Sequence, residues 1–177
     1  MKKSVGFLAL VEYEGLLLAV LQVRGPHNVE KGLCEESWPG GCQVTIHGKT
    51  EPDESVNRAL LREAREEIGV IATDYIRELL ENGHAELVYE LHKEEKVVLT
   101  YAAVLPYEFI QEIRWHPSSG GLRLMAEHEI VCIKDLTKSD IYENIGILCR
   151  IDVAMFPDEI EAVKKAFQIF DRATTSL

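Results

Sequence analysis

The sequence predicts an α/β fold in which a mixed β-sheet is flanked by helices. Apolar, β-favouring segments lie on both sides of an amphipathic helical segment within residues 48–70, and a second helical pattern follows near the end of the chain. At 177 residues the chain has an ordinary length for one domain, so we expect a single domain over residues 1–177.

The composition limits the classes of partner. Hydrophobic residues make up 46% and charged residues 28%, while 30 acidic side chains outnumber 19 basic ones to give a net charge of −11. Binding to nucleic acid needs basic surfaces that displace counterions, so we expect no nucleic-acid partner. A small molecule is the expected partner, and the composition leaves a homodimer open.

The chain start and the cysteines point to the cytoplasm. The first twenty residues have a basic opening and apolar runs, but Glu12 and Glu14 interrupt these runs, so neither a signal peptide nor a membrane span is expected. The cysteines show no C-x-x-C spacing, which favours reduced thiols over a zinc site. The four cysteines are Cys34, Cys42, Cys132 and Cys149.

The chain opens with a predicted β-hairpin, residues 4–13 and 16–23, around Glu14 and Gly15. Arg24 follows the second strand and is a candidate substrate-binding residue. Residues 25–37 are polar and predict a loop near the mouth of an active site.

A turn at residues 38–41 follows, in which Pro39 precedes Gly40 and Gly41. Two glycines permit unusual dihedral angles and close backbone approach, so this segment is either a plain tight turn or a turn whose backbone touches a ligand. Residues 42–47 predict a strand.

Residues 48–70 carry most of the candidate chemistry. Gly48, Pro52 and Asp53 mark a bend, a helix can begin near Glu54 and Ser55, and Gly69 can end it. At about 100° per residue, the helix separates acidic, apolar and basic sides. The acidic side has Glu63, Glu66 and Glu67; the apolar side has Leu60, Leu61, Ala64 and Ile68; the basic side has Arg58, Arg62 and Arg65.

The acidic side is unfavourable by itself. Each like-charge pair at this spacing destabilises an exposed helix by about 0.2–0.5 kcal/mol. Arg62 can offset part of this repulsion, and a divalent cation would offset more. Mg²⁺ binds through a few carboxylates together with substrate phosphates, so the spacing predicts half of a metal site. The alternative is an acidic face that is simply solvated.

The next elements continue the α/β pattern. Residues 73–82 predict a short helix, which Thr73 could cap and Gly83 would end. Residues 85–92 and 96–105 flank a charged turn and predict a second hairpin.

The last third of the chain offers three further candidates. Trp115 begins a loop at residues 115–121 and could either stack on a base or fill a half-buried structural position. Glu127 and Glu129 precede an apolar strand at residues 130–133, where they are either site residues or an exposed lead-in. Pro157 precedes a predicted packing helix at residues 158–171.

The complete spacing of residues 48–70 carries a family resemblance. The pattern is Gly48, five residues, Glu54, seven residues, Arg62-Glu63, two residues, Glu66-Glu67, one residue, Gly69 and the aliphatic Val70. It resembles the Nudix box, and seven specified positions would match by chance about once in a hundred million starting positions. Where a larger aliphatic residue is usual, this chain has Ala64, which predicts tight packing under the helix.

The resemblance implies a Nudix-like α/β/α sandwich with a mixed sheet, in which the box forms a loop–helix–loop. Nudix proteins hydrolyse a diphosphate linkage in a nucleoside diphosphate joined to another group, and they use Mg²⁺ or Mn²⁺. On this basis the candidate metal-binding residues are Glu63, Glu66, Glu67, Glu54 and, through its backbone, Gly40 or Gly41.

The resemblance also suggests catalytic and substrate-binding residues. Arg62 would orient the carboxylates, and Glu63 or a later glutamate, Glu127 or Glu129, would deprotonate the attacking water. Arg24 and Trp115 are candidates for substrate binding.

The residues outside the box leave the substrate open. A proline associated with ADP-ribose hydrolysis is absent from the neighbourhood of Gly83, and Tyr89 is only near the position associated with diadenosine polyphosphates. Two other functions stay open: a nucleotide sensor built on a Nudix fold, and an isopentenyl-diphosphate isomerase with Cys42 as the catalytic thiol.

Overall fold

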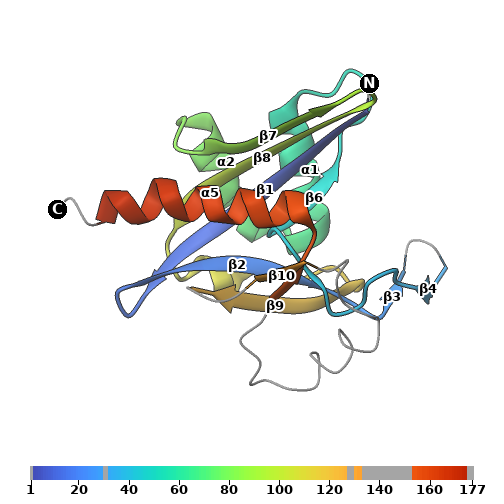
Figure 1. The fold of residues 1–177 in the computed structure, drawn as a ribbon, viewed down its shortest axis with the longest axis horizontal. Coiled ribbons are helices and arrows are strands. Elements are labelled where there is room, and N and C mark those ends of the chain that lie inside the picture. The colour runs from blue at the N-terminus through green and yellow to red at the C-terminus, as the bar shows by residue number, and fades with distance from the viewer. Residues whose placement is uncertain (1, 30–31, 127–129, 133–152, 175–177) are drawn as a thin grey trace.

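A computed structural model describes residues 2–29, 32–126, 130–132 and 153–174. Three helices cover a large sheet (Figure 1). They are α1 (Val56–Ile68), which lies in the box, α2 (Val70–Glu81), which follows it, and the C-terminal helix α5 (Pro157–Thr174). A single helical turn, α3 (Phe109–Glu112), follows the second hairpin. The strands are β1 (Lys2–Tyr13), β2 (Leu16–Arg24), β3 (His27–Asn28), β4 (Cys34–Glu35), β5 (Cys42–Gln43), β6 (Ile46–Lys49), β7 (Glu86–Lys93), β8 (Lys96–Leu105), β9 (Ser119–Met125), β10 (Ile130–Cys132) and β11 (Val153–Met155).

The main sheet is mixed, as the sequence predicts. Its strand order is β10-β11-β5-β2-β1-β8-β7, while β6 also pairs with β1 and β9 also pairs with β2. Strand β1 is parallel to β8 and antiparallel to β2 and β6. Both predicted hairpins, β1–β2 and β7–β8, are confirmed.

Both faces of the sheet are covered, which confirms the α/β/α sandwich. Successive residues of a strand point to opposite faces. Val5 and Phe7 of β1 belong to the core under α1 and α2, whereas Leu8 and Leu10 belong to the core under α5. This double burial explains why β1 is a nearly continuous apolar run. Figure 1 shows α5 crossing one face, with α1 and α2 on the other.

One edge of β1 is shared by two strands, and this split shapes the candidate site. Residues 4–7 of β1 pair with β6, and residues 9–13 pair with β2. Thr45 sits between the two pairings: its Oγ1 accepts from the Ala9 N–H at 2.8 Å and donates to the carbonyl of Val20. The predicted single strand over residues 42–47 is therefore wrong, because Thr45 satisfies the ladder with its side chain and the segment divides into β5 and β6.

Helix α2 begins earlier than the sequence predicts. Its first residue is Val70, and Thr73 lies buried inside the helix, where its Oγ1 donates to the carbonyl of Gly69 at 2.7 Å. The predicted cap at Thr73 is thus wrong, since this hydroxyl bonds back to residue i−4 instead. Gly83, with a φ of +69°, follows the helix as expected.

Two loops contain more regular structure than the sequence predicts. The polar segment at residues 25–37 forms the small β3–β4 hairpin, and β9 begins inside the predicted loop at residues 115–121, where it pairs with β2. The packing helix predicted at residues 158–171 is confirmed as α5. None of the helices in the described part of the chain combines the length and the apolarity needed to cross a membrane.

Candidate active site

Helix α1 is held at both ends as the sequence predicts. The Ser55 side chain accepts from the Arg58 N–H at 3.3 Å, and Gly69, with a φ of +88°, ends the helix. Ala64 is fully buried against the sheet, so its small side chain lets α1 pack closely, as predicted. Because the apolar side faces the core, the acidic side lies beside β6.

Strand β6 orients the carboxylates with its free edge. One edge of β6 pairs with β1. On the other edge, the His47 N–H donates to Glu67 Oε2 at 3.0 Å and the Lys49 N–H donates to Glu63 Oε1 at 3.1 Å. The Lys49 carbonyl accepts from the Arg62 guanidinium at 2.7 Å. Three backbone groups of one strand therefore fix three side chains of α1.

Gly48 is required by the approach of a carboxylate. A Cβ atom built on Gly48 would lie 1.8 Å from Cδ of Glu63 and 2.1 Å from its Oε1. Any side chain at this position would displace Glu63 from the edge of β6. Steric room, rather than a turn conformation, explains the first glycine of the box.

Arg62 forms hydrogen bonds to two of the candidate carboxylates and an ion pair with a third, Glu66, whose Oε2 lies 3.6 Å from a terminal nitrogen. Its Nε and one terminal nitrogen donate to both oxygens of Glu54 at 3.1 and 3.0 Å, and the other terminal nitrogen donates to Glu63 Oε1 at 2.8 Å. The fork to Glu54 raises the pKa of Arg62, and the same bond lowers the pKa of Glu54. The structure thus uses Glu54 to hold Arg62, which in turn positions Glu63.

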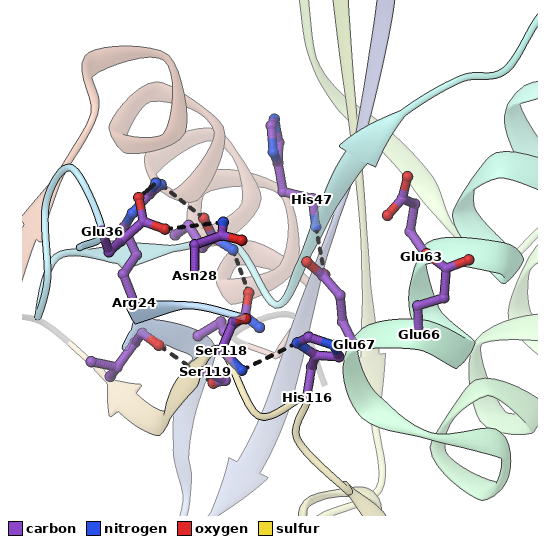
Figure 2. A pocket seen from close by; sticks show the side chains of 13 residues that line it. Arg24, Asn28, Glu36, His47, Glu63, Glu66, Glu67, His116, Ser118 and Ser119 are labelled. Carbon is purple, nitrogen blue, oxygen red and sulfur yellow. Dashed lines mark hydrogen bonds and ion pairs between the residues drawn. The ribbon is translucent and has the colours of Figure 1, made fainter. Parts of the chain in front are cut away.

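The three glutamates of the acidic side open onto one cavity of about 360 Å³. Figure 2 shows Glu63, Glu66 and Glu67 on one wall, facing Arg24 and Glu36 across the cavity. The cavity is lined by Gln22, Val23, Arg24, Asn28, Glu36, Gln43, His47, Glu63, Glu66, Glu67, His116, Ser118 and Ser119.

The opposite wall is built around Arg24, a predicted substrate-binding residue. One terminal nitrogen of Arg24 bonds to Glu36 Oε1 at 2.7 Å, and the other donates to Gln43 Oε1 at 3.2 Å. Burial, the largest single influence, opposes the charge on Glu36, but the hydrogen bonds from Arg24, the Ser37 N–H and Asn28 together with the charge of Arg24 outweigh it and lower the pKa of this carboxyl. The sequence predicts a loop at the site mouth here, without singling out Glu36.

The loop after α3 closes the floor of the cavity. The Arg114 N–H donates to the Ile68 carbonyl and the His116 N–H donates to the Glu67 carbonyl, both at 2.8 Å. These bonds satisfy the last carbonyls of α1 and bring His116 and Ser118 beside Glu67 (Figure 2). Trp115 instead packs against the core under α1, so the structure does not place it in the cavity.

The glycine turn supports Arg24 and does not line the cavity. The Gly40 N–H donates to the Arg24 carbonyl and the Arg24 N–H donates to the Gly41 carbonyl, both at 2.8 Å. The structure therefore does not bring Gly40 to the carboxylates. The other two candidates, Glu127 and Glu129, lie outside the described residues.

The acidic wall fits a hard cation in its chemistry. Burial raises the pKa of Glu63 and the charge of Glu66 raises it further, while Arg62 acts in the opposite direction. A cation beside these oxygens would compensate the negative charge that burial and Glu66 make unfavourable. Within the described residues, however, no three His, Cys, Asp or Glu side chains are arranged around one point. Glu66, whose side chain is 53% exposed, has room to turn toward the other two.

A comparison with protein-family models identifies one family. Residues 2–142 match the family model described as NUDIX domain. A search of curated proteins finds no match to the sequence.

Solved structures share the fold at low identity. A MutT/nudix family protein from Enterococcus faecalis aligns with a TM-score of 0.58 and 18% identity over 96% of this chain, which spans 62% of that protein. The NUDIX domain of Shewanella oneidensis NrtR, complexed with ADP ribose, aligns with a TM-score of 0.54 and 14% identity. The alignment covers 95% of this chain and 87% of that domain. An Ap4A hydrolase from C. elegans aligns with a TM-score of 0.52 and 13% identity. The alignment covers 98% of this chain and 99% of that protein.

Proposed function

The chain belongs to the Nudix family and is a Nudix hydrolase, and from this premise we propose that it is a metal-dependent pyrophosphohydrolase. It would cleave a phosphoanhydride bond in a nucleoside diphosphate linked to another moiety. The observation that carries the proposal is the fixed acidic wall: Glu63 and Glu67 bonded to the edge of β6, with Arg62 bound to Glu63. We also propose that residues 1–177 form one domain that acts in the cytoplasm.

Glu66 and Glu67 would hold Mg²⁺ or Mn²⁺ in this proposal, joined by Glu63 if a later glutamate serves as the base. When bound, the cation neutralises the charge of the diphosphate and lowers the pKa of a bound water. It also reverses the unfavourable field that a chain of net charge −11 presents to a nucleotide.

The side chains of the protein have separate tasks in the reaction. The oxygen of a water forms a bond to one phosphorus, the bridging oxygen leaves with the other phosphate, and a carboxylate takes the proton of the water. Glu63 is the candidate base among the described residues, because its pKa is raised and Arg62 fixes its orientation. Arg24, on the far wall, would exchange one of its bonds to Glu36 or Gln43 for a bond to a phosphate oxygen.

Two structural neighbours bear on the substrate class. The neighbours named above include one complexed with ADP ribose and one named an Ap4A hydrolase, and both names refer to adenosine linked through phosphates. Identities of 13–14% leave the substrate of this chain open among nucleoside triphosphates, nucleotide sugars and dinucleotides.

A substrate panel tests the proposal. Purified protein is incubated with nucleoside triphosphates, nucleotide sugars and dinucleoside polyphosphates, each with Mg²⁺, with Mn²⁺ and with excess chelator. We expect nucleoside monophosphate to be released from at least one substrate only when metal is present. Tight nucleotide binding without turnover across the panel would instead support the sensor.

The isomerase alternative receives no support from Cys42. This thiol is buried in the core under α5, where desolvation raises its pKa to about 12. Cys42 does not line the cavity that contains the carboxylates, so it can neither ionise readily nor reach a substrate there.

A further inference from the structure

The loop between α3 and β9 is held at both sides of the cavity that contains the carboxylates. On one side the His116 N–H donates to the Glu67 carbonyl at 2.8 Å. On the other side the Ser118 carbonyl accepts from the Gly25 N–H, and the Ser118 Oγ accepts from the Val29 N–H, both at 3.0 Å. The side chains of this loop that line the cavity therefore stand on a backbone whose position is fixed.

The imidazole of His116 has one nitrogen bonded and the other available. The Ser118 N–H donates to His116 Nδ1 at 3.2 Å, so Nδ1 is an acceptor, and the neutral ring carries its proton on Nε2. Within the described residues Nε2 makes no hydrogen bond, and it is not one of the polar atoms that are both buried and unpaired, so it is accessible to solvent. His116 lines the cavity of the acidic wall.

This tautomer decides what His116 can bind. A histidine binds a metal ion through the lone pair of a ring nitrogen. The lone pair of Nδ1 is directed to the Ser118 N–H, and Nε2 carries the proton. His116 is therefore a hydrogen-bond donor toward the cavity and not a metal ligand, and its partner has to be an acceptor such as a phosphate oxygen.

Other donors of the cavity are already used within the protein. The two terminal nitrogens of Arg24 bond to Glu36 and to Gln43. The amide nitrogen of Gln43 donates to Gln22, and that of Asn28 donates to Glu36. A ligand has to break one of these bonds to use such a donor, whereas it can accept from His116 Nε2 without breaking any.

The position of His116 beside the acidic wall selects the acceptor. His116 and Glu67 line the same cavity, and Figure 2 shows the imidazole next to Glu67, with Glu63 and Glu66 farther along the wall. In the proposed function a cation at this wall holds a diphosphate, so phosphate oxygens would lie on the side of the cavity that His116 lines. An anion without a cation would be repelled by the carboxylates.

We propose that His116 binds the substrate, with its Nε2–H donating a hydrogen bond to a phosphate oxygen of the diphosphate. This inference rests on the proposed function, which supplies the diphosphate. The ring keeps its proton throughout, since its role is to donate a hydrogen bond and not to transfer a proton. A donor that is fixed in advance stabilises the negative charge that grows on the phosphate oxygens as the bond to the bridging oxygen breaks.

Two substitutions separate the two ring nitrogens. In His116→Asn the side-chain oxygen can accept from the Ser118 N–H in place of Nδ1, but no atom reaches the position of Nε2. In His116→Gln the amide nitrogen can donate from near the position of Nε2, but the contact with Ser118 is lost. Both variants keep the backbone bond to the Glu67 carbonyl. His84→Asn, an exposed change after α2, is the matched control.

Binding is measured by calorimetry with methylenediphosphonate, whose bridging carbon prevents hydrolysis, in the presence and absence of Mg²⁺. We expect the full-length wild type to bind it only with Mg²⁺, about tenfold more tightly than His116→Asn and less than threefold more tightly than His116→Gln. His84→Asn should match the wild type. A loss in His116→Gln with none in His116→Asn would assign the ring to holding Ser118 and overturn the proposal. Absence of binding to the wild type with Mg²⁺ would also overturn it.

NMR observes the ring without turnover and without metal. In protein with ¹⁵N-labelled histidines, the signals of His116 are those lost in both of its variants. We expect the metal-free wild type to show the Nε2–H tautomer, and we expect Mg²⁺ with methylenediphosphonate to shift the Nε2 signal of His116 but not that of His84. An Nδ1–H tautomer would overturn the proposal.

Kinetics separate this inference from the proposed function. For a nucleotide that the wild type hydrolyses, His116→Asn should lower kcat/KM about ten- to a hundredfold and His116→Gln much less, with thermal unfolding confirming that both variants are folded. Equal hydrolysis by wild type and His116→Asn would overturn the role of His116 alone. Binding of methylenediphosphonate that depends on His116, without hydrolysis of any substrate, would overturn the hydrolase proposal and leave the phosphate contact in place.

Discussion

Two partly buried glutamates on opposite faces of the sheet make an instructive comparison. Glu63, beside β6, receives hydrogen bonds from the Lys49 N–H and from Arg62. Glu159, at the start of α5, has one carboxyl oxygen without a partner among the described residues. Burial raises the pKa of both carboxyls, and a neighbouring acid adds to the rise in each case, Glu66 at Glu63 and Asp158 at Glu159. The difference lies in the opposing arginine: Arg62 forms a hydrogen bond to Glu63, whereas Arg24 acts on Glu159 only through its charge.

The difference shows that burial alone does not define the role of a carboxyl. A carboxylate that forms a hydrogen bond to a guanidinium has its charge compensated and its direction fixed, which suits metal binding and base catalysis. A buried carboxyl beside another acid, without a hydrogen bond to a guanidinium, is protonated more readily. The two faces of one sheet thus prepare the same side chain for different chemistry.

The largest expected effect is on the acidic wall itself. Glu67→Gln keeps the shape of the side chain and its contact with the His47 N–H but removes the charge. Since a catalytic cation contributes several kcal/mol, we expect kcat to fall about a hundred- to a thousandfold. Steady-state assays with Mg²⁺ measure the change, and Glu78→Gln serves as the matched surface control. Unchanged turnover would contradict the metal assignment.

The next prediction concerns the close contact at Gly48. Gly48→Ala forces Glu63 away from β6, and overpacking of this kind typically destabilises by about 1–3 kcal/mol. Urea unfolding of Gly48→Ala, Glu63→Ala and the double variant forms a thermodynamic cycle. The double variant should lose less stability than the sum of the single ones, because the clash needs both side chains. Strict additivity would show that the glycine acts through something other than Glu63.

Arg62 offers a smaller test of the same wall. Arg62→Lys keeps the charge but loses the fork that joins Glu54 to Glu63, so we expect kcat to fall about ten- to a hundredfold, as for groups that orient metal ligands. Arg65→Lys, on the exposed side of the same helix, is the control and should behave as wild type. Similar rates for both variants would remove Arg62 from the positioning network.

The smallest effect is a pH dependence that distinguishes the second glutamate. The folded-state pKa of Glu159, about 8, lies above its ordinary 4.5, so the folded state binds this proton more tightly. Its contribution to stability is therefore full below pH 4.5 and is lost as the pH rises toward 8, by at most about 1.4 kcal/mol per pH unit. Urea unfolding at pH 5, 6, 7 and 8 should show a steeper decline for wild type than for Glu159→Gln. Parallel curves would mean that Glu159 is already ionised in the folded protein.

Sequence patterns that involve only neighbouring residues predicted many of the helices and strands. Helix α1 begins and ends at the predicted residues because Ser55 and Gly69 act within one turn of it. The two hairpins follow from apolar runs separated by two-residue turns. Thr73 and the division of residues 42–47 were not predictable in this way, since both depend on where a hydroxyl finds its partner.

The residues of the candidate site divide along the same line. Glu63, Glu66 and Glu67 could be grouped from the helical period. Glu36, His47 and His116 reach the cavity from separate segments, and no spacing in the sequence relates them to α1. Glu159 was predicted only as part of a packing helix. The burial of its Oε2 without a hydrogen-bond partner arises only when α5 packs on the sheet.

The sequence by itself determined the family, the order of the elements and the acidic ridge, since each depends on spacing along one segment. Only the tertiary structure decided which backbone edge orients that ridge, why Gly48 has no side chain, and that one oxygen of Glu159 is buried without a partner among the described residues. Those features arise where segments far apart in the chain meet, and burial and hydrogen bonding there depend on atoms that no local pattern specifies.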